Sequence, residues 1–164
     1  MKKILFILIL IKAQSISAQN TAFKKVLDEH INQTVPLITV DSLKKNFSNY
    51  TILDAREKNE FEVSHIKNAI FVGYENFRIS KISNKISKKT PIVIYCSIGY
   101  RSEKIAENIQ KEGYQVYNLY GGIFLWANEG NEVVNTNNES TKKIHGYNKD
   151  WGKWLINSEV VYEK

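Results

Sequence analysis

Apolar residues recur along the chain in short runs separated by polar segments. Four runs are rich in β-branched and aromatic residues and predict strands at Tyr50–Ala55, Ala69–Gly73, Pro91–Cys96 and Gln115–Tyr120. A shorter strand is predicted through Ile38 and Val40. The run "IVIY" has no polar alternation, which is typical of a strand buried on both faces of a sheet.

The segments between these strands favour helices. Phe23, Val26, Leu27 and Ile31 follow a helical spacing and predict a first amphipathic helix. Further helices are predicted over residues 41–47, with Asp41 as N-cap, 58–63, about 75–86, and 102–112, ending at Gly113. Alternating strands and helices predict an α/β fold with a mainly parallel central sheet of about five strands and helices on both faces.

The N-terminus predicts export. Lys2 and Lys3 precede the apolar run Ile4–Ile11, and Ala18 offers a small residue for cleavage, so residues 1–18 have the pattern of a cleavable signal peptide. We therefore expect a periplasmic or secreted protein with no stable membrane anchor after cleavage. Without residues 1–18 the formal charge falls from +6 to about +3, and the lysines are scattered, so nucleic acid is not an expected partner.

The mature chain has a suitable length for one domain. We expect a helical extension over residues 19–39, the main domain over 40–135, and a polar linker with a tryptophan-containing tail over 136–164. We expect the protein to be a monomer. Trp151 and Trp154 are three residues apart and are expected to dock on the domain, because two exposed indoles would be unfavourable.

Cys96 is the only cysteine, so it is either a small buried hydrophobic residue or a reactive group. It lies at the carboxyl end of a predicted strand, where open α/β sheets bind ligands. Gly99 permits a tight turn, Arg101 supplies positive charge, and Ser102 is a candidate N-cap for the next helix. A helix N-terminus beside a cation stabilises a thiolate or an anionic substrate, which favours the reactive role.

From about Val40 to Gly130 the sequence strongly resembles the rhodanese (thiosulfate sulfurtransferase) homology domain. The loop matches the pattern C-x-x-G-x-R, the segment "LDAREKNEFEVSHIKNA" resembles the family's upstream signatures, and "LYGGIFLW" matches L-x-G-G-x-x-x-W. The last match predicts that Gly121 and Gly122 let the final helix pack closely, with Trp126 in the core. The resemblance implies a rhodanese-like fold.

The resemblance also implies a sulfurtransferase in which Cys96 accepts a sulfane sulfur as a persulfide and passes it to a thiol or cyanide. The donor would be thiosulfate or a similar small anion. The residues expected to bind substrate are Ser97, Ile98, Gly99, Tyr100, Arg101 and Ser102. Asp54 and Arg56 are expected to shape the pocket. No cofactor is implied, and no cluster of His, Cys and acidic residues has metal-ligand spacing.

Two other functions stay open. The chain is alternatively a non-catalytic or thiol-redox binding module of the same fold, or, less favoured, an enzyme with phosphatase-like activity. Only four residues separate Cys96 from Arg101, whereas the related phosphatases have five, so the loop favours a persulfide. Ile98 stands where the family often has a small polar residue, which leaves the sulfur donor open.

Overall fold

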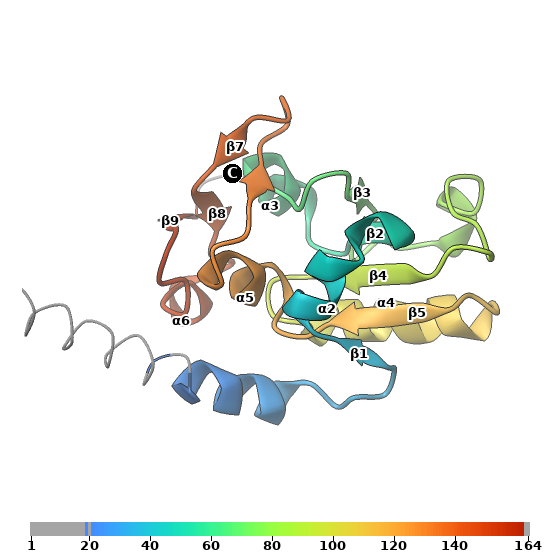
Figure 1. Ribbon diagram of the computed structural model, residues 1–164, viewed down its shortest axis with the longest axis horizontal. Coiled ribbons are helices and arrows are strands. Elements are labelled where there is room, and N and C mark those ends of the chain that lie inside the picture. Colours follow the sequence, from blue (N-terminus) through green and yellow to red (C-terminus); the bar gives the residue numbers. More distant parts are fainter. Residues whose placement is uncertain (1–18, 20, 163–164) are drawn as a thin grey trace, which may run out of the picture.

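The computed structural model describes residue 19 and residues 21–162, so the predicted signal peptide lies outside the described residues. Five strands form one parallel sheet in the order β1-β5-β4-β2-β3 (Figure 1). The strands are β1 (Leu37–Ile38), β2 (Thr51–Asp54), β3 (Ile70–Phe71), β4 (Ile92–Tyr95) and β5 (Val116–Leu119). The predicted parallel α/β sheet is confirmed.

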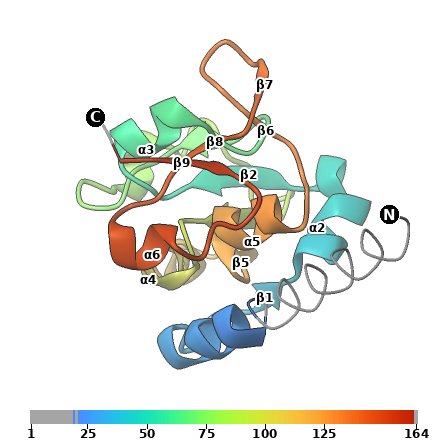
Figure 2. The ribbon, with the colours of Figure 1, turned by 90° about the vertical axis from the view of Figure 1, so that its left-hand side faces the viewer.

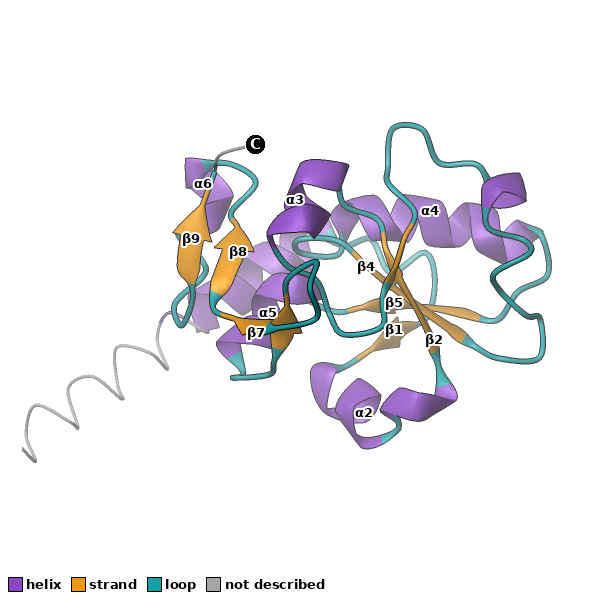
Figure 3. Cartoon of the chain, turned by 90° about the horizontal axis from the view of Figure 1, so that it is seen from above, coloured by secondary structure: helices purple, strands orange, loops and turns teal. Residues whose placement is uncertain are grey.

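Helices cover both faces of this sheet (Figure 3). The described helices are one over residues 21–30, α2 (Val40–Lys45), α3 (Lys58–Val63), α4 (Tyr100–Lys111), α5 (Gly122–Asn128) and α6 (Lys149–Gly152). The last of these, α6, lies away from this sheet. Short 3₁₀ turns are η1 (Phe47–Asn49) and η2 (Ile79–Lys81). Within the described part of the chain, no helix combines the length and apolar character needed to cross a bilayer.

Strand β4 lies at the centre of the molecule and is fully buried. Its side chains alternate between two cores, as the pleat of a strand requires. Val93 and Tyr95 pack into the core on the side of α2 and α5, whereas Ile92 and Ile94 pack into the core on the side of α4. The next residue of this second set is Cys96, so the strand that builds the core also aims the thiol.

The predicted helix boundaries need three corrections. Helix α2 begins at Val40 and is capped by Thr39, whose hydroxyl accepts the N–H of Ser42 at 3.2 Å, and Asp41 lies inside it. Helix α4 begins at Tyr100 with Gly99 as N-cap, so Ser102 is not the cap. The helix predicted over 75–86 is wrong, because only η2 forms there; serine, asparagine and β-branched isoleucine in this segment are poor helix formers.

The segment predicted as a polar linker contains regular structure. Strands β6 (Val133–Val134) and β7 (Ser140–Thr141) pair antiparallel, and His65 makes an isolated bridge to Val134. Both valines are buried, which anchors the hairpin although its turn is polar. The chain then forms β8 (Lys143–His145), the helix α6, and β9 (Glu159–Val161). Strands β8 and β9 pair in parallel.

The C-terminal segment packs against the N-terminal helix and α3 (Figure 2). The ring of Trp154 stacks on Phe23 with centroids 5.4 Å apart, and Trp151 meets His30 edge-on at 5.0 Å. Ile144 and Leu155 are buried in the same core. The predicted docking of both tryptophans is therefore confirmed, although only Trp151 lies in a helix.

Replacing Trp154 with alanine should destabilise the protein, because the substitution removes a large ring that holds the tail on the N-terminal helix. For a half-buried tryptophan we expect a loss of about 2 kcal/mol, which lowers the melting temperature by roughly 4–8 °C. Differential scanning calorimetry of the variant beside Lys142→Ala, an exposed change in the same segment, measures this. Equal melting temperatures would show that the tail adds nothing to stability.

Candidate active site

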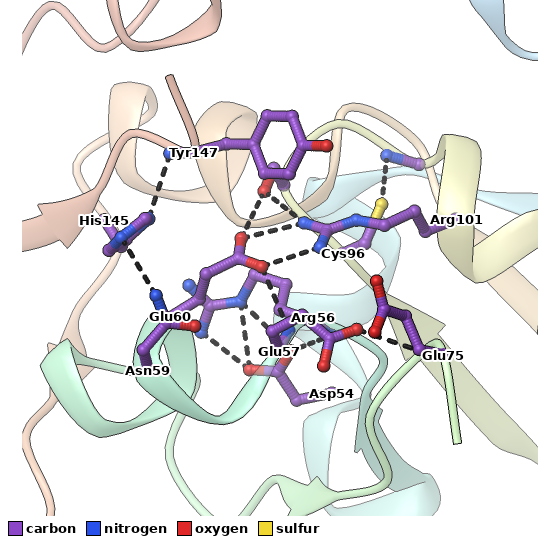
Figure 4. Close-up of polar contacts among 12 residues, drawn as sticks. Asp54, Arg56, Glu57, Asn59, Glu60, Glu75, Cys96, Arg101, His145 and Tyr147 are labelled. Carbon is purple, nitrogen blue, oxygen red and sulfur yellow. Dashed lines mark hydrogen bonds and ion pairs between the residues drawn. The ribbon is translucent and has the colours of Figure 1, made fainter. Parts of the chain in front are cut away.

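Cys96 is the first residue after β4 and lies at the carboxyl edge of the sheet, where the sequence placed it. Its side chain is almost completely buried, with 1% of the residue exposed. The backbone N–H of Gly99 donates a hydrogen bond to Sγ at 3.2 Å (Figure 4). The loop thus folds back over the sulfur and presents a backbone donor to it.

Gly99 gives the loop its turn. Its φ is +114°, in a region that residues with a side chain rarely adopt, and an added Cβ would lie 2.9 Å from the Ile31 side chain. The amide of Asn118 donates to the carbonyl of Gly99 at 2.9 Å, and the hydroxyl of Ser102 lies 3.1 Å from the same carbonyl. Ser102 is therefore placed beneath the loop, where it holds the turn, and does not line the pocket.

The beginning of the loop is hydrogen-bonded to the N-terminal turn of α5. The N–H groups of Ile123 and Phe124 donate to the carbonyls of Cys96 and Ser97, at 3.0 and 3.1 Å. A side chain at Gly122 would meet the carbonyl oxygen of Cys96 at 2.3 Å, so only glycine permits this approach. The predicted close packing after the two glycines is confirmed, and Trp126 lies in the core as expected.

The guanidinium of Arg101 is held by other side chains of the protein. Its guanidinium donates to both carboxylate oxygens of Glu60, at 2.6 and 2.8 Å, and to the hydroxyl of Ser97 at 2.9 Å. The Ser97 hydroxyl in turn donates to Glu60 at 3.0 Å. The ring of Tyr147 covers the guanidinium, 4.8 Å from ring centroid to Cζ.

Glu60 stays charged in this buried position. Burial acts to raise its pKa, but the hydrogen bonds and charge of Arg101 and the charge of Arg56 outweigh burial and hold the pKa below its ordinary value. Burial likewise acts against the charged form of Arg101, and its bonds to Glu60 reverse this and raise the pKa of the guanidinium. The two side chains therefore form a charged pair that fixes α3 to the loop.

Asp54 and Arg56 form a second ion pair behind the first. Both are completely buried, with Arg56 Nη2 2.6 Å from Asp54 Oδ2 and also donating to the carbonyl of Ser64 at 2.6 Å. Neither residue lines the pocket above Cys96. They anchor the segment that leads into α3, so they influence the pocket only indirectly.

A cavity of about 370 Å³ opens over Cys96. The loop contributes the residues Cys96, Ser97, Ile98, Tyr100 and Arg101 to its lining. Gly99, also predicted to bind substrate, contributes its backbone N–H at the sulfur instead. Within the described residues, no group of three His, Cys, Asp or Glu side chains is placed to hold a metal ion.

The remaining lining residues were not predicted from the sequence. They are His30, Glu57, Tyr74, Glu75, Tyr147 and Trp151. None belongs to the loop motif, and two of them come from the tail, so no spacing in the sequence connects them to Cys96. The bonds of Glu60 to Arg101 were not predicted from the sequence either.

The segment that contains Cys96 is similar in sequence to known proteins. The Rhodanese-like domain family matches residues 39–129, more than half of the sequence. Thiosulfate sulfurtransferase GlpE of Coxiella burnetii (strain RSA 331 / Henzerling II) is 32% identical over 76 residues, which cover 46% of this chain and 69% of that protein. A tRNA uridine(34) hydroxylase of Aster yellows witches'-broom phytoplasma (strain AYWB) is 39% identical over 81 residues but is covered over only 26% of its length.

Solved structures agree with the sequence match. The rhodanese-related protein from Thermoplasma volcanium superposes with a TM-score of 0.53 at 28% identity, covering 61% of this chain and 98% of that one. A rhodanese-like domain protein from Staphylococcus aureus gives a TM-score of 0.52 at 29% identity, covering 58% and 95%. With the parallel sheet and the Cys96 loop in place, the chain belongs to the rhodanese-like domain family.

Proposed function

We propose that the protein is a sulfurtransferase that moves a sulfane sulfur from thiosulfate or a similar donor to a thiophilic acceptor through a persulfide on Cys96. One observation carries the proposal: Cys96 lines the cavity, and the Gly99 N–H donates to its Sγ. The name of the GlpE relative is consistent with this chemistry.

The reaction needs only the thiol and its surroundings. The Cys96 thiolate attacks the outer sulfur of thiosulfate, the sulfur–sulfur bond of thiosulfate breaks, and sulfite leaves with the bonding electrons. The resulting persulfide then gives its terminal sulfur to cyanide or a thiolate, which restores the Cys96 thiolate. No oxidant or cofactor is required in either step.

The loop is suited to hold the anionic sulfur in each state. The Gly99 N–H already donates to Sγ, and α4, a helix of 12 residues, begins at Tyr100 and directs its unpaired N–H groups toward the loop. Because these donors are fixed by Gly99, Asn118 and α5, little reorganisation is needed when charge moves onto the sulfur.

Mass spectrometry of the intact protein tests the proposal. After incubation with thiosulfate the chain should gain the mass of one sulfur atom, and cyanide should remove it with formation of thiocyanate. Cys96→Ser should fold normally and gain nothing, because a hydroxyl forms no persulfide and the two side chains are similar in size. A wild-type protein that gains no sulfur would instead support a non-catalytic or thiol-redox binding module.

The same preparation should not hydrolyse p-nitrophenyl phosphate. The four residues between Cys96 and Arg101 form a small cradle, and the guanidinium is occupied by Glu60, so it is not free to bind the oxygens of a phosphoryl group. A spectrophotometric assay for p-nitrophenol, with Cys96→Ser as background, measures this. Hydrolysis that depends on Cys96, without a detectable persulfide, would favour a phosphatase.

A further inference from the structure

Part of the pocket wall is contributed by segments outside the family match over residues 39–129. His30 comes from the N-terminal helix, and Tyr147 and Trp151 come from the tail. Together with Tyr74 and Tyr100 they bring five aromatic rings to the cavity lining. Tyr100 and Tyr147 are also well exposed, with 45% and 50% of each residue accessible to solvent, so they border the entrance.

Two carboxylates also belong to the lining. In Figure 4, Glu57 and Glu75 lie on the other side of Cys96 from the Tyr147 ring. The N–H of Glu75 donates to the carboxylate of Glu57 at 3.2 Å, which brings the two residues together. Among the residues that the structure describes, neither carboxylate forms an ion pair with a lysine or arginine.

The positive charge near Cys96 does not offset these carboxylates. Arg101 is the one lysine or arginine among the described lining residues, and both of its terminal nitrogens bind Glu60. The Arg101–Glu60 pair contributes no net charge, so Glu57 and Glu75 leave the pocket negative. Such a pocket favours a cationic donor over a dianion such as thiosulfate.

We propose that the pocket selects organic persulfides whose carbon chain ends in a protonated amine. Aromatic faces and carboxylates are the groups that recognise an ammonium ion, and the Tyr147 ring already stacks on a guanidinium. A short carbon chain fits the apolar lining while its amine reaches Glu57 or Glu75. This inference rests on the proposed function, since it names the donor for the same Cys96.

The transfer is balanced without a further reactant. The Cys96 thiolate attacks the terminal sulfur of R–S–SH, a bond forms between that sulfur and Sγ, and the sulfur–sulfur bond of the donor breaks. The proton stays on the transferred sulfur, and the donor leaves as the thiolate R–S⁻. The amine of R takes no part in the bonds and serves only to place the donor.

A series of donors with the same two-carbon spacer tests the charge preference. Full-length protein is mixed with the persulfides of cysteamine, N-acetylcysteamine and 3-mercaptopropionate, which end in a cation, a neutral amide and an anion. The rate at which Cys96 gains one sulfur is followed by intact mass in single turnover. Each rate is divided by the rate of the same donor with free N-acetylcysteine, which removes differences in intrinsic reactivity.

The cationic donor should react about tenfold faster than the anionic one after this correction, as expected for a half-exposed charge near two carboxylates. Glu75→Gln should reduce that ratio about threefold. Glu62→Gln, which removes an exposed carboxylate paired with Lys58 outside the pocket, should leave the ratio unchanged. Increasing salt should reduce the ratio in the wild type.

The outcomes separate this inference from the proposed function. If Cys96 gains sulfur from all three donors at equal corrected rates, or fastest from the anionic one, the amine preference is wrong and the sulfurtransferase proposal stands. If Cys96 gains sulfur from none of the three and none from thiosulfate, the proposed function itself is wrong. An equal loss of preference in Glu62→Gln and Glu75→Gln would contradict a role of the pocket carboxylate.

Discussion

The ion pair between Glu60 and Arg101 is the contact on which the geometry of the site depends. It joins α3 to the loop after β4, and the Ser97 hydroxyl bonds to both partners. Glu60 itself is fixed by α3, where its carboxylate also accepts the N–H of Glu57. A buried pair of this kind is costly to break from one side, because the remaining charge loses its partner. The loop therefore has one favoured position, and Cys96 with it.

This ion pair also determines the role of Arg101 in the site. In the sequence, Arg101 has the position of a group that attracts an anionic donor. In the structure its charge is balanced by Glu60 and its face is covered by Tyr147, while the Gly99 N–H donates to the sulfur. Arg101 thus holds the loop, and the donor selectivity that we propose depends on the pocket walls that the N-terminal helix and the tail supply.

The sequence predicted those features that depend on local pattern. The run at Pro91–Cys96 placed β4 and the thiol correctly because a strand buried on both faces must be continuously apolar. The paired glycines before α5 indicated close backbone packing, and Gly122 has it. The contact of Glu60 with Arg101, 41 positions apart, and the approach of Tyr147 to the pocket depend on tertiary packing. No local period or motif in the sequence indicates such contacts. Helix α4 begins at Tyr100 and not at the predicted residue 102, because Gly99 takes the N-cap position.

We propose that Glu60 and Arg101 act as one unit that holds Cys96 in position for sulfur transfer. The most direct measurement is a double-mutant cycle on the rate of Cys96 persulfidation by thiosulfate, with Glu60→Gln, Arg101→Gln and the double variant. Each single change should slow the reaction about tenfold or more, and the double variant should be no slower than the slower single one, since contacting partners are strongly non-additive. If the fold-loss in rate of the double variant equals the product of the two single fold-losses, Glu60 and Arg101 act independently. That result would contradict the proposal that they act as one unit.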